Sequence, residues 1–146
     1  MNASGPGQLL FGFVRHWSRR SRSADGSVAE QGRLVLATEA VAALAGRGEP
    51  ATVNAVADEI GIDQSGASRL ITSAVAAGYL TMMSSPSDGR RRPAAVTSAG
   101  HAVLAQAHAW QERKFDELTA GWSQQRRAEF QRAMVDLMVR SYEIDG

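Results

Sequence analysis

The chain has 146 residues, of which 44% are hydrophobic and 21% charged, and its formal net charge is +1. This length and composition are typical of one globular domain and exclude a disordered chain. The absence of cysteine excludes disulfides, thiolate metal sites and thiol-based redox switches. No apolar run is long enough for a membrane span, and the run at residues 9–14 is too short for a signal peptide. We therefore expect a cytoplasmic protein.

The charges are unevenly distributed along the chain. Residues 1–22 carry four arginines and no acidic residue, and residues 64–111 carry four arginines and one acidic residue. Lys114 is the only lysine. Because guanidinium groups suit planar, bidentate recognition of phosphate and guanine, this segregation predicts an anionic partner for part of the surface.

Two helices are predicted in the first third of the chain. Residues 8–22 have a broad apolar face, and residues 35–46 have a buried stripe that ends at Gly46. Residues 21–32 between them are rich in serine and glycine, which predicts a loop.

The stretch TVNAVADEIGIDQSGASRLITSAVAAGYL, residues 52–80, predicts two short helices joined by a turn. Asn54 is expected to cap the first helix, which ends at Gly61, and Asp63 to cap the second. This arrangement is typical of a helix-turn-helix. The second helix has a small, polar face made of Gln64, Ser65, Ser68, Arg69, Thr72 and Ser73. A merely solvated face would normally carry Glu and Lys pairs, so this face predicts close approach to another surface.

Two short strands, residues 79–84 and 91–97, are predicted on either side of an arginine-rich turn. Pro93 can lie only at an edge of this hairpin or outside its ladder. The turn contains Asp88, Gly89, Arg90, Arg91 and Arg92. A basic hairpin tip beside a DNA-reading helix can reach the minor groove, where the potential favours arginine. The alternative is a solvated turn with incidental charge.

Two further helices are predicted after the hairpin. The first runs from Thr97 or Ser98 to about Ala120, and Ser123 is expected to cap the second, which has a clear apolar stripe.

Three side chains on the first of these helices, His101, His108 and Glu112, lie on one helical stripe. Seven residues of helix span about 10.5 Å, so the two histidines cannot bind one ion together. His108 and Glu112 could share an ion only with ligands from elsewhere, perhaps His16, and we expect no metal site. The sequence also lacks a phosphate-binding loop, an HExxH motif and a G-x-S-x-G motif. We therefore expect that the protein is not an enzyme.

The order of these elements resembles the MarR family of winged-helix transcriptional regulators. The wing pattern of that family is matched by Asp88, Arg90, Thr97 and Gly100. The helix-turn-helix pattern is matched by Val56-Ala57, Ser68-Arg69-Leu70 and Gly78-Tyr79-Leu80. The chain departs from the family where Thr81-Met82-Met83 replaces the basic residues that often enter the wing, so we expect no ion pair between that strand and Asp88.

The resemblance implies a mainly α fold with a small β-hairpin wing and a single domain over residues 1–146. It implies a winged helix-turn-helix lobe at 35–97 and a helical dimerisation region at 8–22 and 98–142. The homodimer interface would include Leu9, Leu10, Phe13, Phe130, Met134, Leu137 and Met138. The expected function is regulation of transcription, as a repressor or otherwise, by binding pseudo-palindromic double-stranded DNA.

The resemblance also assigns roles to individual residues. The DNA contacts would be the six polar residues of the second short helix together with Arg90, Arg91 and Arg92, in a wing shaped by Asp88 and Gly89. A small, often aromatic anion would bind near His16, Trp17, Ala40, Leu104 and His108. No cofactor is expected. The alternative function is a winged-helix module whose basic wing binds an acidic protein partner.

Overall fold

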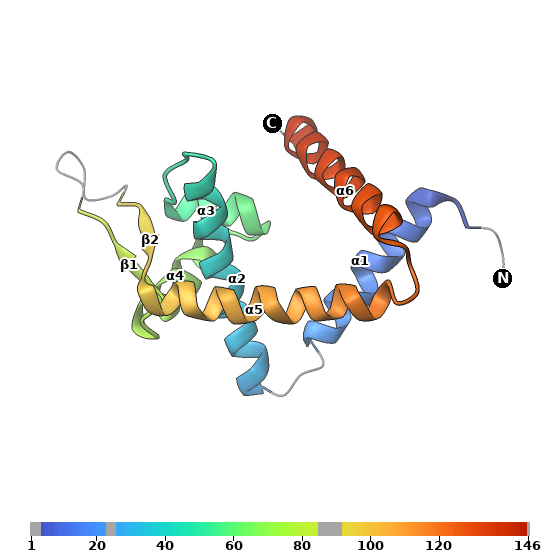
Figure 1. Cartoon of the computed structure of the whole chain (residues 1–146). Coiled ribbons are helices and arrows are strands. Elements are labelled where there is room, and N and C mark those ends of the chain that lie inside the picture. The colour runs from blue at the N-terminus through green and yellow to red at the C-terminus, as the bar shows by residue number, and fades with distance from the viewer. Residues whose placement is uncertain (1–3, 23–25, 85–91, 146) are drawn as a thin grey trace. The chain divides into compact units, whose positions relative to one another are not determined.

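The computed structural model describes residues 4–22, 26–84 and 92–145 (Figure 1). The described residues form six helices and two strands, in the order α1 (Pro6–Arg22), α2 (Gly26–Gly46), α3 (Val53–Ile60), α4 (Gln64–Ala76), β1 (Leu80–Met82), β2 (Ala94–Val96), α5 (Ser98–Leu118) and α6 (Gln124–Asp145). This confirms the expected mainly α fold with one small β-hairpin. None of the helices in these ranges is long and apolar enough to cross a membrane.

The prediction of a loop over residues 21–32 was wrong for most of that segment. Helix α1 continues to Arg22, and α2 begins at Gly26. The serines and glycines of this segment are followed by Glu30 and Gln31, which favour a helix. Gln31 also makes a tertiary contact, because its Nε2 donates a hydrogen bond to the Tyr79 hydroxyl at 2.8 Å.

The helix caps were predicted correctly in two cases and wrongly in one. Asp63 Oδ1 accepts a hydrogen bond from the Gly66 amide at 2.7 Å, and Ser123 Oγ accepts one from the Arg126 amide at 3.1 Å. Helix α3 is capped by Thr52, not by Asn54, which lies inside the first turn. Thr52 has extended backbone angles, as a capping residue needs, and its side chain accepts from the Ala55 amide.

The contacts divide the chain into two units, residues 1–107 and residues 108–146. In the first unit, α2 packs against α3, α4 and β2, and α4 packs against α3 and β1. The core that these elements share consists of Leu34, Ala40, Val41, Leu44, Ala51, Val56, Ala57, Ala67, Ile71, Ala74, Leu80 and Ala94. Since half of these residues are alanines, the helix backbones can approach one another closely.

The hairpin is antiparallel, with Leu80 opposite Val96 and Met82 opposite Ala94. Its strands are shorter than predicted, although single backbone bonds extend the pairing beyond them. Pro93 lies outside the strands, as expected. The Ala94 amide donates to the Ala51 carbonyl at 2.9 Å, so β2 is also tied to the connection between α2 and α3.

In the second unit, an aromatic cluster joins the end of α5 to the start of α6. The Phe115 and Phe130 rings stack with centroids 6.0 Å apart, and Trp122 meets Phe130 edge-on at 5.7 Å. Arg126 lies over the Trp122 ring, and Arg127 forms an ion pair with Asp116. These contacts support α6, none of whose described side chains is buried.

Candidate DNA-binding interface

Helix α4 presents the polar side chains that the sequence singled out. Its apolar residues Ala67, Ile71 and Ala74 are buried against the core. All six predicted polar residues are exposed: Gln64, Ser65, Ser68, Arg69, Thr72 and Ser73. The Asp63 cap satisfies one amide of the first turn, which stabilises the start of the helix where a DNA-reading helix makes its base contacts.

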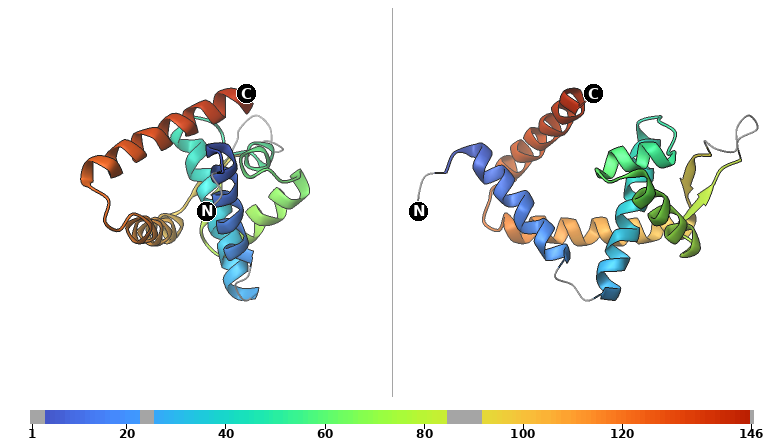
Figure 2. Two further views of the ribbon diagram at one scale, coloured as in Figure 1. Left: turned by 90° about the vertical axis from the view of Figure 1, so that its right-hand side faces the viewer. Right: turned by 180° about the vertical axis from the view of Figure 1, so that it is seen from behind.

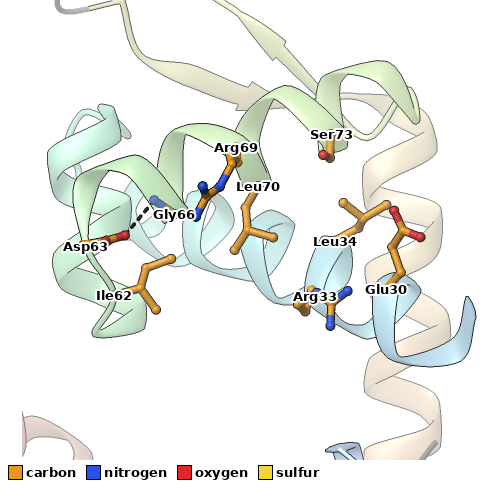
Figure 3. Close-up of a pocket in the computed structure, with 9 residues that line it drawn as sticks. All are labelled: Glu30, Arg33, Leu34, Ile62, Asp63, Gly66, Arg69, Leu70 and Ser73. Atoms are coloured by element: carbon orange, nitrogen blue, oxygen red, sulfur yellow. Dashed lines mark hydrogen bonds between the residues drawn. The ribbon is translucent and has the colours of Figure 1, made fainter. Parts of the chain in front are cut away.

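An open groove of about 430 Å³ separates α4 from the N-terminal half of α2 (Figure 3). Its lining is Glu30, Arg33, Leu34, Ile62, Asp63, Gly66, Arg69, Leu70 and Ser73. The polar face of α4 is therefore divided. Arg69 and Ser73 line this groove, whereas Ser65, Ser68 and Thr72 do not.

The groove brings Arg33 and Arg69 to the same hollow from two helices (Figure 3). Both side chains are exposed. Sequence reasoning did not select Arg33, because the helix was expected to begin after it. Extending the predicted helix toward the N-terminus, through Leu34, would have placed Arg33 on α2.

The tip of the wing lies outside the described residues, and with it Asp88, Gly89, Arg90 and Arg91. Arg92 is described and exposed. Its Nε donates a hydrogen bond to the Met83 carbonyl at 3.1 Å. Arg92 therefore contacts the opposite arm of the hairpin.

The base of the wing is held by Thr97. Its amide donates to the Tyr79 carbonyl at 3.0 Å, and its hydroxyl donates to the Gly78 carbonyl. The same hydroxyl accepts a hydrogen bond from the Gly100 amide at 3.0 Å. Thr97 thus joins the end of α4, the hairpin and the first turn of α5.

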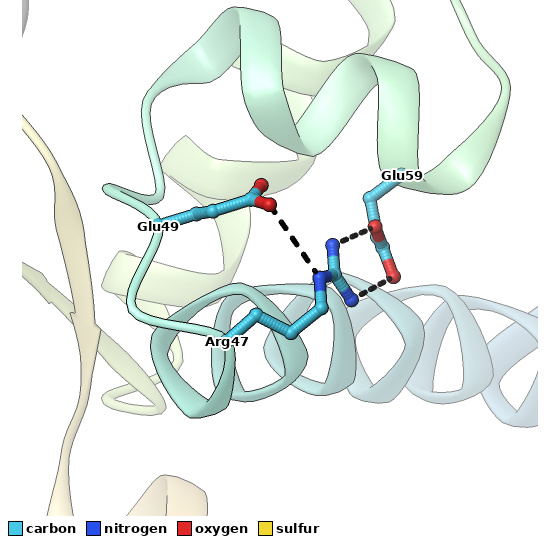
Figure 4. Close-up of polar contacts among 3 residues, drawn as sticks. All are labelled: Arg47, Glu49 and Glu59. Atoms are coloured by element: carbon cyan, nitrogen blue, oxygen red, sulfur yellow. Dashed lines mark hydrogen bonds and ion pairs between the residues drawn. The ribbon is translucent and has the colours of Figure 1, made fainter. Parts of the chain in front are cut away.

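A charged cluster fixes α3 against the end of α2 (Figure 4). The two Nη atoms of Arg47 contact the two carboxylate oxygens of Glu59 at 3.2 and 2.6 Å. Arg47 Nε lies 3.8 Å from Glu49 Oε1. Because this pairing is bidentate, it restrains the direction of α3 as well as its distance from α2.

The residues expected to bind a small ligand lie in different environments. His16 is exposed on α1, and its ring meets that of Trp17 edge-on at 5.6 Å. Ala40 and Leu104 are buried in the first unit. His108 belongs to the second unit. Among the described residues, no group of His, Asp and Glu side chains is arranged to hold a metal ion.

The apolar residues expected at a dimer interface are all exposed, with relative accessibilities between 39% and 62%. They are Leu9, Leu10 and Phe13 on α1, and Phe130, Met134, Leu137 and Met138 on α6. Other apolar residues of α6 are exposed as well, including Val135, Val139 and Ile144. The apolar surface of α6 is therefore broader than the predicted stripe.

A capped helix with an exposed polar face, packed on a second short helix and followed by a β-hairpin, defines the winged-helix fold. Residues 35–91 match the model of the MarR family. The matched segment covers the helix-turn-helix and most of the wing, the part of the chain that resembles this family in sequence.

Solved structures show the same fold. A crystal structure of MarR is 20% identical, with a TM-score of 0.72, and the match covers 100% of this chain and 97% of that one. A MarR family protein from Bacillus stearothermophilus is 14% identical, with a TM-score of 0.65 and coverage of 93% and 92%. The Multiple Antibiotic Resistance Repressor, MarR, is 15% identical, with a TM-score of 0.66 and coverage of 93% and 96%. A comparison with curated proteins gave no match.

Proposed function

We propose that this chain is a transcriptional regulator of the MarR family, which binds pseudo-palindromic double-stranded DNA as a homodimer and represses transcription. The observation that carries the proposal is the exposed face of α4, which has small polar side chains and one arginine on a firmly packed helix. Repression, rather than activation, is supported by the similarity to the Multiple Antibiotic Resistance Repressor, MarR. A cytoplasmic location agrees with a DNA partner.

The polar face of α4 suits the major groove. Its small side chains allow the helix to lie close to the base edges. Gln64, Ser65 and Ser68 are near its N-terminus, and the N-terminal residues of such a helix contact the bases in the major groove. Arg69 offers the bidentate donors that recognise guanine or phosphate. The wing arginines, Arg90 to Arg92, would add contacts to the backbone or the minor groove.

We place the dimer interface on α1 and α6. Their exposed apolar side chains form patches that seldom remain uncovered in a soluble protein. The DNA-binding lobe would then comprise residues 35–97, and the dimerisation region residues 8–22 and 98–142, within one functional domain. Symmetric pairing would set the two α4 helices roughly 34–36 Å apart, which is one turn of DNA, or a multiple of that distance.

We also propose that a small aromatic or anionic ligand releases the protein from DNA. The groove between α2 and α4 supports this proposal, because Arg33 and Arg69 flank a partly apolar lining that also carries Glu30 and Asp63 (Figure 3). The buried side chains of Ala40 and Leu104 support it less well. A ligand in this groove would compete directly with DNA for Arg69 and Ser73.

A gel shift with the DNA upstream of the protein's own gene tests the function. We expect a shifted band that a specific competitor abolishes and a scrambled duplex of equal length does not. Ser68→Glu, which adds a negative charge to the exposed face of α4, should remove the shift. The alternative function, a wing that binds an acidic protein, predicts no specific shift and no effect of Ser68→Glu on that partner.

A further inference from the structure

One position in the hairpin lacks its usual donor. In an antiparallel pair, opposing residues that are hydrogen-bonded exchange two bonds, one in each direction. The register places Met83 opposite Pro93, one step beyond Met82 and Ala94. The Met83 amide donates to the Pro93 carbonyl at 2.8 Å. Pro93 has no N–H and cannot donate the return bond to Met83.

The side chain of Arg92 supplies that bond. Its Nε lies 3.1 Å from the Met83 carbonyl oxygen and donates to it. Both backbone polar groups of Met83 are therefore bonded to the opposite arm, one to the Pro93 backbone and the other to the Arg92 side chain. The amide of Ala94, the next residue, is used elsewhere, because it donates to the Ala51 carbonyl.

We propose that Arg92 is a positioning residue of the wing, whose Nε–H replaces the N–H that Pro93 lacks. This extends the ladder by one pair, to the point where the chain continues toward Arg90 and Arg91. On the first arm of the hairpin, Thr81-Met82-Met83 carry no charge that could brace the wing. Arg92 provides the brace from the other arm. The inference deepens the proposed DNA-binding function and rests on it for its consequence in binding.

Arg92 keeps other N–H groups that can contact a phosphate, so the bracing role must be separated from the charge. Arg92→Gln and Arg92→Met both remove the charge. Only glutamine keeps an N–H donor, its Nε2, at the same number of bonds from the backbone as Arg92 Nε. The two variants therefore form a matched pair that differs at the donor. Pro93→Ala is the rescue variant, because alanine restores a backbone N–H opposite Met83.

The first measurement is hydrogen exchange at the Met83 amide in the free protein. Arg92→Met should exchange faster than Arg92→Gln by roughly two- to tenfold, the range for loss of one hydrogen bond. Adding Pro93→Ala to Arg92→Met should return the exchange rate to that of Arg92→Gln. Equal exchange in Arg92→Gln and Arg92→Met, or no rescue by Pro93→Ala, would overturn the proposal.

The second measurement is DNA affinity over a series of salt concentrations. The Gln and Met variants should share one salt slope, because both have lost the same charge. Arg92→Met should bind more weakly than Arg92→Gln at every salt concentration, and Pro93→Ala should recover that difference. Equal affinities would show that Arg92 acts through its charge alone. If the wild-type protein binds no DNA, the proposed function fails, while the exchange measurement still decides whether Arg92 braces the hairpin.

Discussion

Gly100 lies directly against the backbone carbonyl of Tyr79. A Cβ atom at residue 100 would come within 2.2 Å of that oxygen and 2.7 Å of Val96 Cγ1. The contact is to backbone, which cannot move aside as a flexible side chain can. Gly100 therefore allows α5 to begin against the junction between α4 and β1, where Thr97 bonds to both sides. The end of α4 and the start of α5 are therefore coupled at this point.

Replacing Gly100 tests that coupling. Gly100→Ala should destabilise the fold by about 1–3 kcal/mol or more, because the methyl group overlaps the Tyr79 carbonyl. Gly32→Ala is the matched control, since Gly32 is an exposed helical glycine with nothing within 4 Å of an added Cβ. The control should be stabilised by about 0.5–1 kcal/mol. Urea unfolding of the two variants measures both effects, and similar stabilities would contradict the prediction.

Arg69 and Arg90 should contribute to DNA binding in different ways. Arg69→Ala should cost about 1–3 kcal/mol on the cognate site and relax the preference at particular base pairs. Arg90→Ala should weaken binding to all sequences. It should also reduce the slope of log affinity against log salt concentration by about one, because a protein with one phosphate contact fewer releases fewer counterions when it binds. Titrations on cognate and scrambled duplexes at several salt concentrations separate the two. If Arg90→Ala binds like the wild type throughout, the wing is a solvated turn.

The pair formed by Arg47 and Glu59 should contribute more to stability than an ordinary surface ion pair. Its bidentate geometry and partial burial favour a coupling energy near 1 kcal/mol. A double-mutant cycle with Arg47→Ala and Glu59→Ala measures this value. The cycle for Lys114 and Glu117, a more exposed pair, should give less than about 0.5 kcal/mol. Equal coupling energies would mean that the arginine geometry adds nothing.

The dimer should depend on the apolar surface of α6. Light scattering should show a dimer for the wild type, and Leu137→Glu should shift the equilibrium toward monomer, because a buried unpaired charge is costly. Asp136→Asn is the control on the same helix and should leave the dimer intact. The circular dichroism of Leu137→Glu should retain most of its helical signal, since Leu137 is exposed in the single chain. A wild-type monomer at micromolar concentration would refute this interface.

Peroxide should act on this protein only through methionine. Met83 is the more exposed of the two methionines on the first arm of the hairpin, so it should oxidise before Met82. Mass spectrometry of peroxide-treated protein checks this order. Loss of DNA binding that a thiol reductant reverses would contradict the prediction, because the chain has no cysteine.

Much of the fold followed from local patterns. Asp63 before an amphipathic helix specified the start of α4, and the apolar period of that helix specified which face is buried. The same period left Ser65, Ser68 and Thr72 exposed, as the structure confirms. The order of the elements and the helix-turn-helix pattern were enough to indicate the family whose model matches residues 35–91. These features depend on residues close together in the chain, where spacing and propensity act directly.

Other features required the tertiary structure. The start of α2 at Gly26 was missed, because the propensity of a short serine- and glycine-rich segment does not include contacts such as the one between Gln31 and Tyr79. The choice of Thr52 over Asn54 as a cap depends on where the preceding chain becomes extended. The groove unites Arg33 with Arg69 only because α2 packs beneath α4. The bond from Arg92 to Met83 depends on strand register, which places a proline opposite a carbonyl that needs a donor. Such relationships join residues distant in sequence, and packing decides them.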